Sequence, residues 1–74
     1  MYELNGKIYR YKSDAVIAAL KADEDLAKWY REEHGVDDDW INSLNASNCN
    51  TYGENAPGDI CDLIAEDAGI SETD

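Results

Sequence analysis

The chain has 74 residues, with 17 Asp and Glu against 6 Lys and Arg, so its formal net charge is −11. This length accommodates one domain, which we expect to span residues 1–74, and the charge excludes direct binding to nucleic acid or anionic lipid because both are polyanions. A hydrophobic fraction of 43% excludes a disordered acidic tail. The sequence shows no apolar run near the roughly 18 residues of a membrane span and no secretory signal. We therefore expect a folded cytoplasmic protein.

The first predicted element is a β-hairpin of residues 2–4 and 7–11 around the turn Asn5-Gly6. Asn-Gly favours a two-residue turn because both positions tolerate a positive φ. In this register Tyr2 lies opposite Tyr9, and Ile8 is the one apolar residue on the polar face. The other face carries Tyr2, Leu4, Tyr9 and Tyr11. We expect this aromatic face to pack on helices, because two strands alone are marginally stable.

A helix is predicted to follow the hairpin. Ser13 is a good N-cap for a helix that starts at Asp14, and the apolar stripe of that helix is Val16, Ile17 and Leu20. The acidic run 23–25 has two interpretations. It is either the capped start of a second helix or the solvent face of one long helix, and we favour a break near residues 22–23.

The second helix would carry Leu26, Trp29 and Tyr30 on its apolar face, and Gly35 predicts its end. Residues 37–39, all Asp, precede Trp40, Ile41 and Leu44, which predicts a short helix with one Asp as its N-cap. Residues 45–57 are rich in Asn, Ser and Gly and predict an ordered but irregular loop.

A last helix is predicted to open at Pro57 and to end at Gly69. Its apolar face would be Ile60, Leu63, Ile64 and Ala68. Its outer face would be Asp59, Asp62, Glu66 and Asp67. We expect Ile70 to pack back on the core and residues 71–74 to fray. Together these elements predict an α+β fold, a small single domain in which the hairpin packs against three or four short helices.

Metal sites and catalytic sites are poorly supported by the sequence. A calcium loop that starts at Asp37 would lack the Gly and the bidentate Glu that such a loop requires. The side chains that could bind zinc are those of Cys49, Cys61 and His34, and their spacing in the sequence is not that of a zinc site. We expect Cys61 to lie in the core. A disulfide between the two cysteines is not favoured in a reducing cytosol. No nucleophile has an adjacent base, so we expect no enzyme activity and no cofactor.

The acidic residues themselves are the remaining candidate site. Residues 1–34 hold seven acidic and six basic residues, a net charge of −1, whereas residues 35–74 hold ten acidic residues and no Lys or Arg, a net charge of −10. Helix positions three or four apart lie about 5–6 Å from each other, a spacing similar to that of phosphates along a nucleic-acid strand. The candidate partner-binding residues are Asp37, Asp38, Asp39, Glu54, Asp59, Asp62, Glu66 and Asp67, with Trp40 or Tyr52 as an aromatic anchor.

In these respects the chain resembles the small acidic proteins that phages and mobile elements encode, among them DNA mimics and anti-CRISPR proteins. The resemblance is carried by the length, the net charge, the stretch 35–74 without Lys or Arg, and the lack of a catalytic signature. It implies an inhibitor in a bacterial cytoplasm that binds a basic nucleic-acid-binding protein or complex, with a CRISPR effector as the specific candidate, and occludes its channel by charge mimicry.

Two other interpretations remain open. A structural or assembly module would bind through the hairpin edge or through a dimer patch of Tyr9, Tyr11, Trp29 and Trp40. An antitoxin-like protein would use the same electrostatics against a basic toxin.

Overall fold

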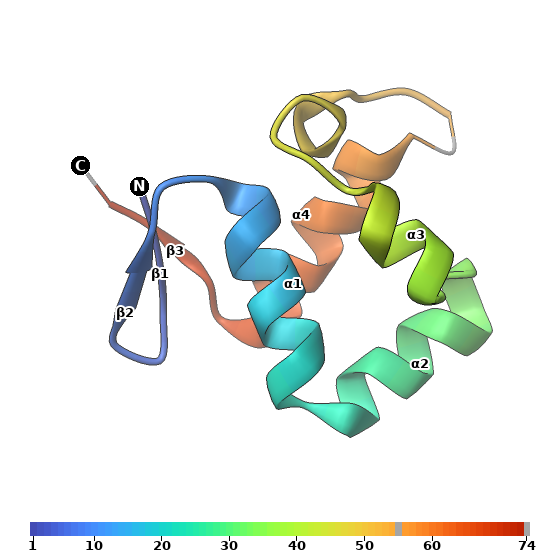
Figure 1. The fold of residues 1–74 in the computed structure, drawn as a ribbon, viewed down its shortest axis with the longest axis horizontal. Helices are drawn as coiled ribbons and strands as arrows, with labels where there is room; N and C mark the ends of the chain where they lie inside the picture. Colours follow the sequence, from blue (N-terminus) through green and yellow to red (C-terminus); the bar gives the residue numbers. More distant parts are fainter. Residues whose placement is uncertain (55, 74) are drawn as a thin grey trace.

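The computed structural model describes residues 1–54 and 56–73 and confirms an α+β fold. Its strands are β1 (Tyr2–Leu4), β2 (Lys7–Tyr9) and β3 (Ser71–Glu72), and its α-helices are α1 (Lys12–Ala22), α2 (Glu24–His34), α3 (Asp38–Ser43) and α4 (Pro57–Ala68). The sheet lies at one end of the molecule, α2 and α3 lie toward the other, and α1 and α4 lie between them (Figure 1).

The hairpin forms in the predicted register. Asn5 and Gly6 have φ values of 52° and 85°, and Tyr2 pairs with Tyr9. Leu4 is buried and Ile8 is exposed, as the alternation of faces requires. The prediction was wrong at Tyr11, which lies beyond the end of β2 and is exposed, because the chain turns there into α1.

Helix α1 begins two residues earlier than its sequence signals predict. Its N-cap is Tyr11, whose side chain makes no capping hydrogen bond, and Ser13 lies inside the helix instead of capping it. Both Lys12 and Ser13 are buried. Contacts with distant parts of the chain therefore outweigh the local capping preference of Ser13.

The acidic run after α1 breaks the helix, as we favoured. Asp23 has extended backbone angles, and its Oδ1 accepts a hydrogen bond from the amide of Leu26. Tyr30 is buried, but Trp29 is half exposed, which contradicts its predicted place on the apolar face. Gly35 ends α2 in the left-handed conformation that the sequence predicts.

Helices α3 and α4 also start and stop near their predicted boundaries. Asp37 caps α3 by accepting a hydrogen bond from the amide of Trp40, and Gly69 ends α4 with a φ of 77°. On α4 the apolar face was mispredicted at one position: Leu63 is 45% exposed, and Cys61 is fully buried beside Ile64. The loop before α4 contains a 3₁₀ turn, η1 (Asn48–Asn50); Asn55 lies outside the described residues.

The predicted frayed tail is wrong for the residues that the structure describes. Ser71 and Glu72 form β3, which pairs antiparallel with β1, so the sheet order is β2-β1-β3. Ile70, immediately before β3, packs against the core as predicted. The strands β1 and β3, from opposite ends of the described chain, lie side by side in the sheet (Figure 1), and Asp74 lies outside the described residues.

The hydrophobic core is built mainly by the helices. Its buried members are Val16, Leu20, Tyr30, Val36, Leu44, Cys49, Cys61 and Ile64. Helix α4 packs against both α1 and η1. As a result, the outward side of α4 and most of α3 remain on the surface. No helix of the described chain is both long and apolar enough to cross a membrane.

Candidate protein-binding face

The acidic residues of the C-terminal half lie on the surface. Every one that the structure describes is solvent-exposed: Asp37, Asp38, Asp39, Glu54, Asp59, Asp62, Glu66, Asp67 and Glu72. Within residues 1–54 and 56–73, one ion pair forms, between Asp62 and Lys12. The negative charge of this half is therefore largely uncompensated by contacts within the protein.

Asp62 differs from its neighbours on α4 because it is bound. Its Oδ1 accepts a hydrogen bond of 2.6 Å from the Lys12 ammonium, which also donates to the hydroxyl of Tyr52 at 2.8 Å. Burial by itself lowers the pKa of Lys12, but the hydrogen bonds to Asp62 and Tyr52 outweigh it, so the pKa lies above its usual value. Lys12 therefore stays charged at neutral pH. Asp62 and Tyr52 are both engaged with Lys12, so neither side chain is free to bind a partner on its own.

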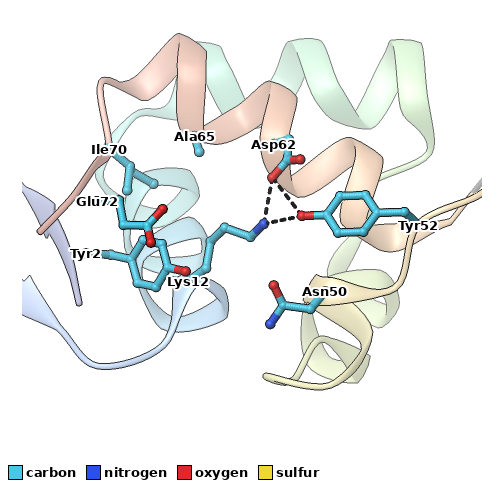
Figure 2. A pocket seen from close by; sticks show the side chains of 8 residues that line it. All are labelled: Tyr2, Lys12, Asn50, Tyr52, Asp62, Ala65, Ile70 and Glu72. Carbon is cyan, nitrogen blue, oxygen red and sulfur yellow. Dashed lines mark hydrogen bonds and ion pairs between the residues drawn. The ribbon is translucent and has the colours of Figure 1, made fainter. Parts of the chain in front are cut away.

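Figure 2 shows that Lys12 reaches across a polar hollow toward Asp62 and Tyr52. This hollow has a volume of about 410 Å³, and Tyr2, Asn50 and Glu72 also line it. Its single ammonium is already paired, and the residues lining it include no imidazole or thiol. A nucleophile with an adjacent base is thus not assembled there.

Asp67 is also engaged. Its Oδ2 accepts a hydrogen bond of 2.5 Å from the hydroxyl of Tyr30, which belongs to the buried core. Burial and this hydrogen bond raise the pKa of the Tyr30 hydroxyl, because both favour its neutral form. The two flanks of the predicted acidic face of α4 are therefore used to hold α1 and α2.

The outward stripe of α4 consists of Asp59, Leu63 and Glu66, at i, i+4 and i+7. This spacing places the three side chains on one side of the helix. Asp59 makes a long contact of 3.4 Å with the amide of Gly53. An exposed leucine between two carboxylates was missed in the sequence because helical periodicity placed Leu63 with the core residues.

Leu63 borders a groove between the end of α2, α3 and the start of α4. The groove has a volume of about 510 Å³, with Trp40 and Ile60 as further apolar lining and Glu33 and Asp59 as its carboxylates. Trp40 and Ile60 are half-buried against the core. Two predicted site residues, Trp40 and Asp59, are thus brought together, and we call the groove with Leu63 and Glu66 the α4 face.

The other predicted acidic residues lie apart from this groove. Asp38 lines a separate hollow together with Lys21 and Arg31. Asp37 is the N-cap of α3, and Glu54 lies in the loop before α4. The carboxylates are therefore not one continuous row, and on the α4 face Asp59 lies beside the apolar side chains of Trp40, Ile60 and Leu63.

Cysteine and metal chemistry find little support within the described residues. Cys49 and Cys61 are free thiols, both fully buried, which confirms the predicted core position of Cys61. The hydrogen bond to Cys49, together with burial, raises the pKa of Cys61, so its thiol stays protonated. The ring of His34 contacts the rings of Trp29 and Tyr30. Within residues 1–54 and 56–73, no three His, Cys, Asp or Glu side chains are placed so that they could hold one metal ion.

Comparison of the chain with protein-family models, with curated proteins and with solved structures finds no match.

Proposed function

We propose that this protein binds and inhibits a nucleic-acid-processing complex by occupying a basic channel with its acidic C-terminal half. The observation that carries the proposal is the exposure of the acidic residues beyond Gly35, with a single ion pair to a basic side chain in the described chain. A solvated surface with so strong a single sign of charge attracts a positively charged partner and raises the rate of encounter.

The α4 face gives this attraction a place to bind. Its carboxylates Asp59 and Glu66 stand on α4, which packs against α1 and η1 and is hydrogen-bonded to α2 through Asp67, so the spacing of the two is fixed before a partner arrives. The exposed Leu63 and the half-buried Trp40 add apolar contact area, which charge alone does not provide. A partner with a basic groove and an apolar rim fits this combination, and a CRISPR effector is the specific candidate that the resemblance implies.

The decisive experiment is a displacement assay with purified CRISPR effectors and other nucleic-acid-processing complexes. A fluorescent duplex is bound to each complex, and its anisotropy is followed as the protein is added. We expect stoichiometric displacement from the target, weakened by added salt because exposed charges are screened beyond about 10 Å at 0.1 M.

A charge-reversal variant locates the surface. In the triple variant Glu33→Lys, Asp59→Lys, Glu66→Lys, which reverses the carboxylates of the α4 face, displacement should be lost, while Asp62 and Asp67 keep their bonds to Lys12 and Tyr30. The matched control Asp14→Lys, Asp25→Lys, Glu32→Lys changes the net charge by the same amount on α1 and α2 and should still displace the duplex. Equal loss in both variants would mean that net charge, not this surface, causes inhibition.

An assembly module is the second candidate, and the exposure of Trp29 favours it. This indole is half exposed and packs edge-to-face on Tyr30, with ring centroids 4.8 Å apart. Light scattering at low and high salt distinguishes the candidates. An apolar dimer would strengthen with salt, whereas an electrostatic complex weakens.

A further inference from the structure

We infer that the groove of the α4 face receives an arginine side chain of the protein partner; this inference rests on the proposed function. The groove combines two kinds of lining that a guanidinium group requires. Trp40, Ile60 and Leu63 supply apolar and aromatic surface, Glu33 and Asp59 supply negative charge, and His34 also lines the groove.

Arginine fits this combination better than lysine. Its planar guanidinium stacks on an indole ring and also donates two parallel hydrogen bonds to one carboxylate. Its aliphatic stem covers apolar surface while the charged end reaches the carboxylates. An ammonium is more strongly hydrated and has no flat face, so it gains less from Trp40.

The charges of the protein also argue against a second copy of the chain as the occupant. Two copies that each carry a formal charge of −11 repel each other. A partner that presents a basic side chain is attracted by the same field. The occupant that matches the groove is therefore an arginine, with apolar neighbours, on a nucleic-acid-binding protein surface.

The test uses a short capped peptide with one arginine between two leucines, titrated into the isotope-labelled protein and followed by NMR. We expect concerted shifts of the Trp40 indole N–H and the Leu63 methyl groups. The same peptide with lysine should bind about threefold more weakly, and the peptide with uncharged citrulline should not bind.

A pair of variants separates the groove from general charge. Asp59→Asn keeps an acceptor for the Gly53 amide and should weaken the arginine peptide about threefold, whereas Asp14→Asn removes the same charge on α1, outside the groove, and should leave binding unchanged. Equal weakening in both variants, or equal binding of the arginine and lysine peptides, overturns the arginine site but leaves the charge-based function in place.

Two further outcomes would also overturn the inference. If no peptide shifts Trp40 or Leu63, the groove does not bind a basic side chain, whatever the displacement assay shows. If these signals shift with protein concentration in the absence of peptide, a second copy of the chain occupies the groove.

Discussion

Lys12 connects the two halves of the molecule through its side chain. It is 9% exposed, and its partner Asp62, fifty residues later in the chain, is 53% exposed. Burial of an ammonium is costly unless it is paired and hydrogen-bonded, and here both conditions are met. The pair thus fixes the start of α1 against the middle of α4.

Because Lys12 is buried and Asp62 is exposed, we expect substitutions of the two residues to destabilise the protein by different amounts. Lys12→Met leaves a carboxylate that water can solvate and should cost about 1 kcal/mol of unfolding free energy. Asp62→Ala leaves a buried ammonium bound only to Tyr52 and should cost about 2–3 kcal/mol. Urea denaturation measures both losses. A smaller loss for Asp62→Ala than for Lys12→Met would contradict the role of burial.

Tyr30 predicts how stability depends on alkaline pH. Because its pKa in the folded protein lies above the usual 10.0, its contribution is complete below pH 10 and is lost as the pH rises through the higher folded value. Lys12 acts in the same direction above its usual 10.5. We therefore expect the melting temperature to fall above pH 10.

Phenylalanine variants check the origin of this alkaline loss. Tyr30→Phe should be about 1 kcal/mol less stable near neutral pH, because the bond to Asp67 is gone, and should lose less stability above pH 10. Tyr11→Phe removes an exposed tyrosine hydroxyl and serves as the control. An alkaline decline that is unchanged in Tyr30→Phe would assign the effect to other groups.

At the level of elements, α4 is held closely against the loop that precedes it. A Cβ at Gly58 would lie 2.4 Å from the carbonyl oxygen of Thr51, which accepts the Gly58 amide at 2.9 Å. Gly58→Ala should therefore cost about 1–3 kcal/mol in urea unfolding, despite the better helix propensity of alanine. This position shows no requirement for a positive φ, so the local sequence does not reveal it.

Gly69→Ala is the contrasting substitution. Gly69 has a φ of 77° and no atom within 4 Å of its missing Cβ. The substitution should lower the free energy of unfolding by only about 1 kcal/mol, because alanine adopts the left-handed backbone conformation less readily than glycine. If both variants lose the same amount, close approach of α4 to the loop is not the dominant effect at Gly58.

The pairing of β3 with β1 contributes to the stability of the sheet. The amide of Thr73 donates a hydrogen bond of 2.7 Å to the carbonyl oxygen of Met1, beside the pairing of β3 with β1. Thr73→Pro removes this donor and should destabilise the protein by about 1 kcal/mol, with faster amide exchange in β1. In Thr73→Ser, which keeps the backbone amide, the amide protons of β1 should exchange at the original rate. Unchanged exchange of the β1 amides in Thr73→Pro would indicate that the pairing of β3 with β1 is not stable.

For the whole molecule, the unequal division of charge predicts a response to salt. The half beyond Gly35 carries ten acidic residues and repels itself, and screening reduces this repulsion. We expect the melting temperature to rise by about 2–5 °C between low and moderate NaCl. Differential scanning calorimetry measures this rise, and a flat response would show that the carboxylates are already well separated.

The sequence by itself determined the elements whose signals are local. The Asn-Gly turn and the terminating Gly35 and Gly69 lie where they were predicted, and the acidic runs 23–25 and 37–39 each supply an N-cap, because these residues act through their own backbone or their nearest neighbours. The charge division and the α+β class were predictable for the same reason, since composition and periodicity do not depend on packing.

Only the tertiary structure decided which acidic side chains remain free and which apolar ones stay exposed. Asp62 and Asp67 belong to the same predicted outer face of α4 as Asp59 and Glu66, yet the first two bind Lys12 and Tyr30 from distant segments. Leu63 has the periodicity of a core residue but faces outward. The contacts of Asp62 and Asp67 span 50 and 37 residues of sequence, and periodicity within a helix carries no information about what packs against each of its sides.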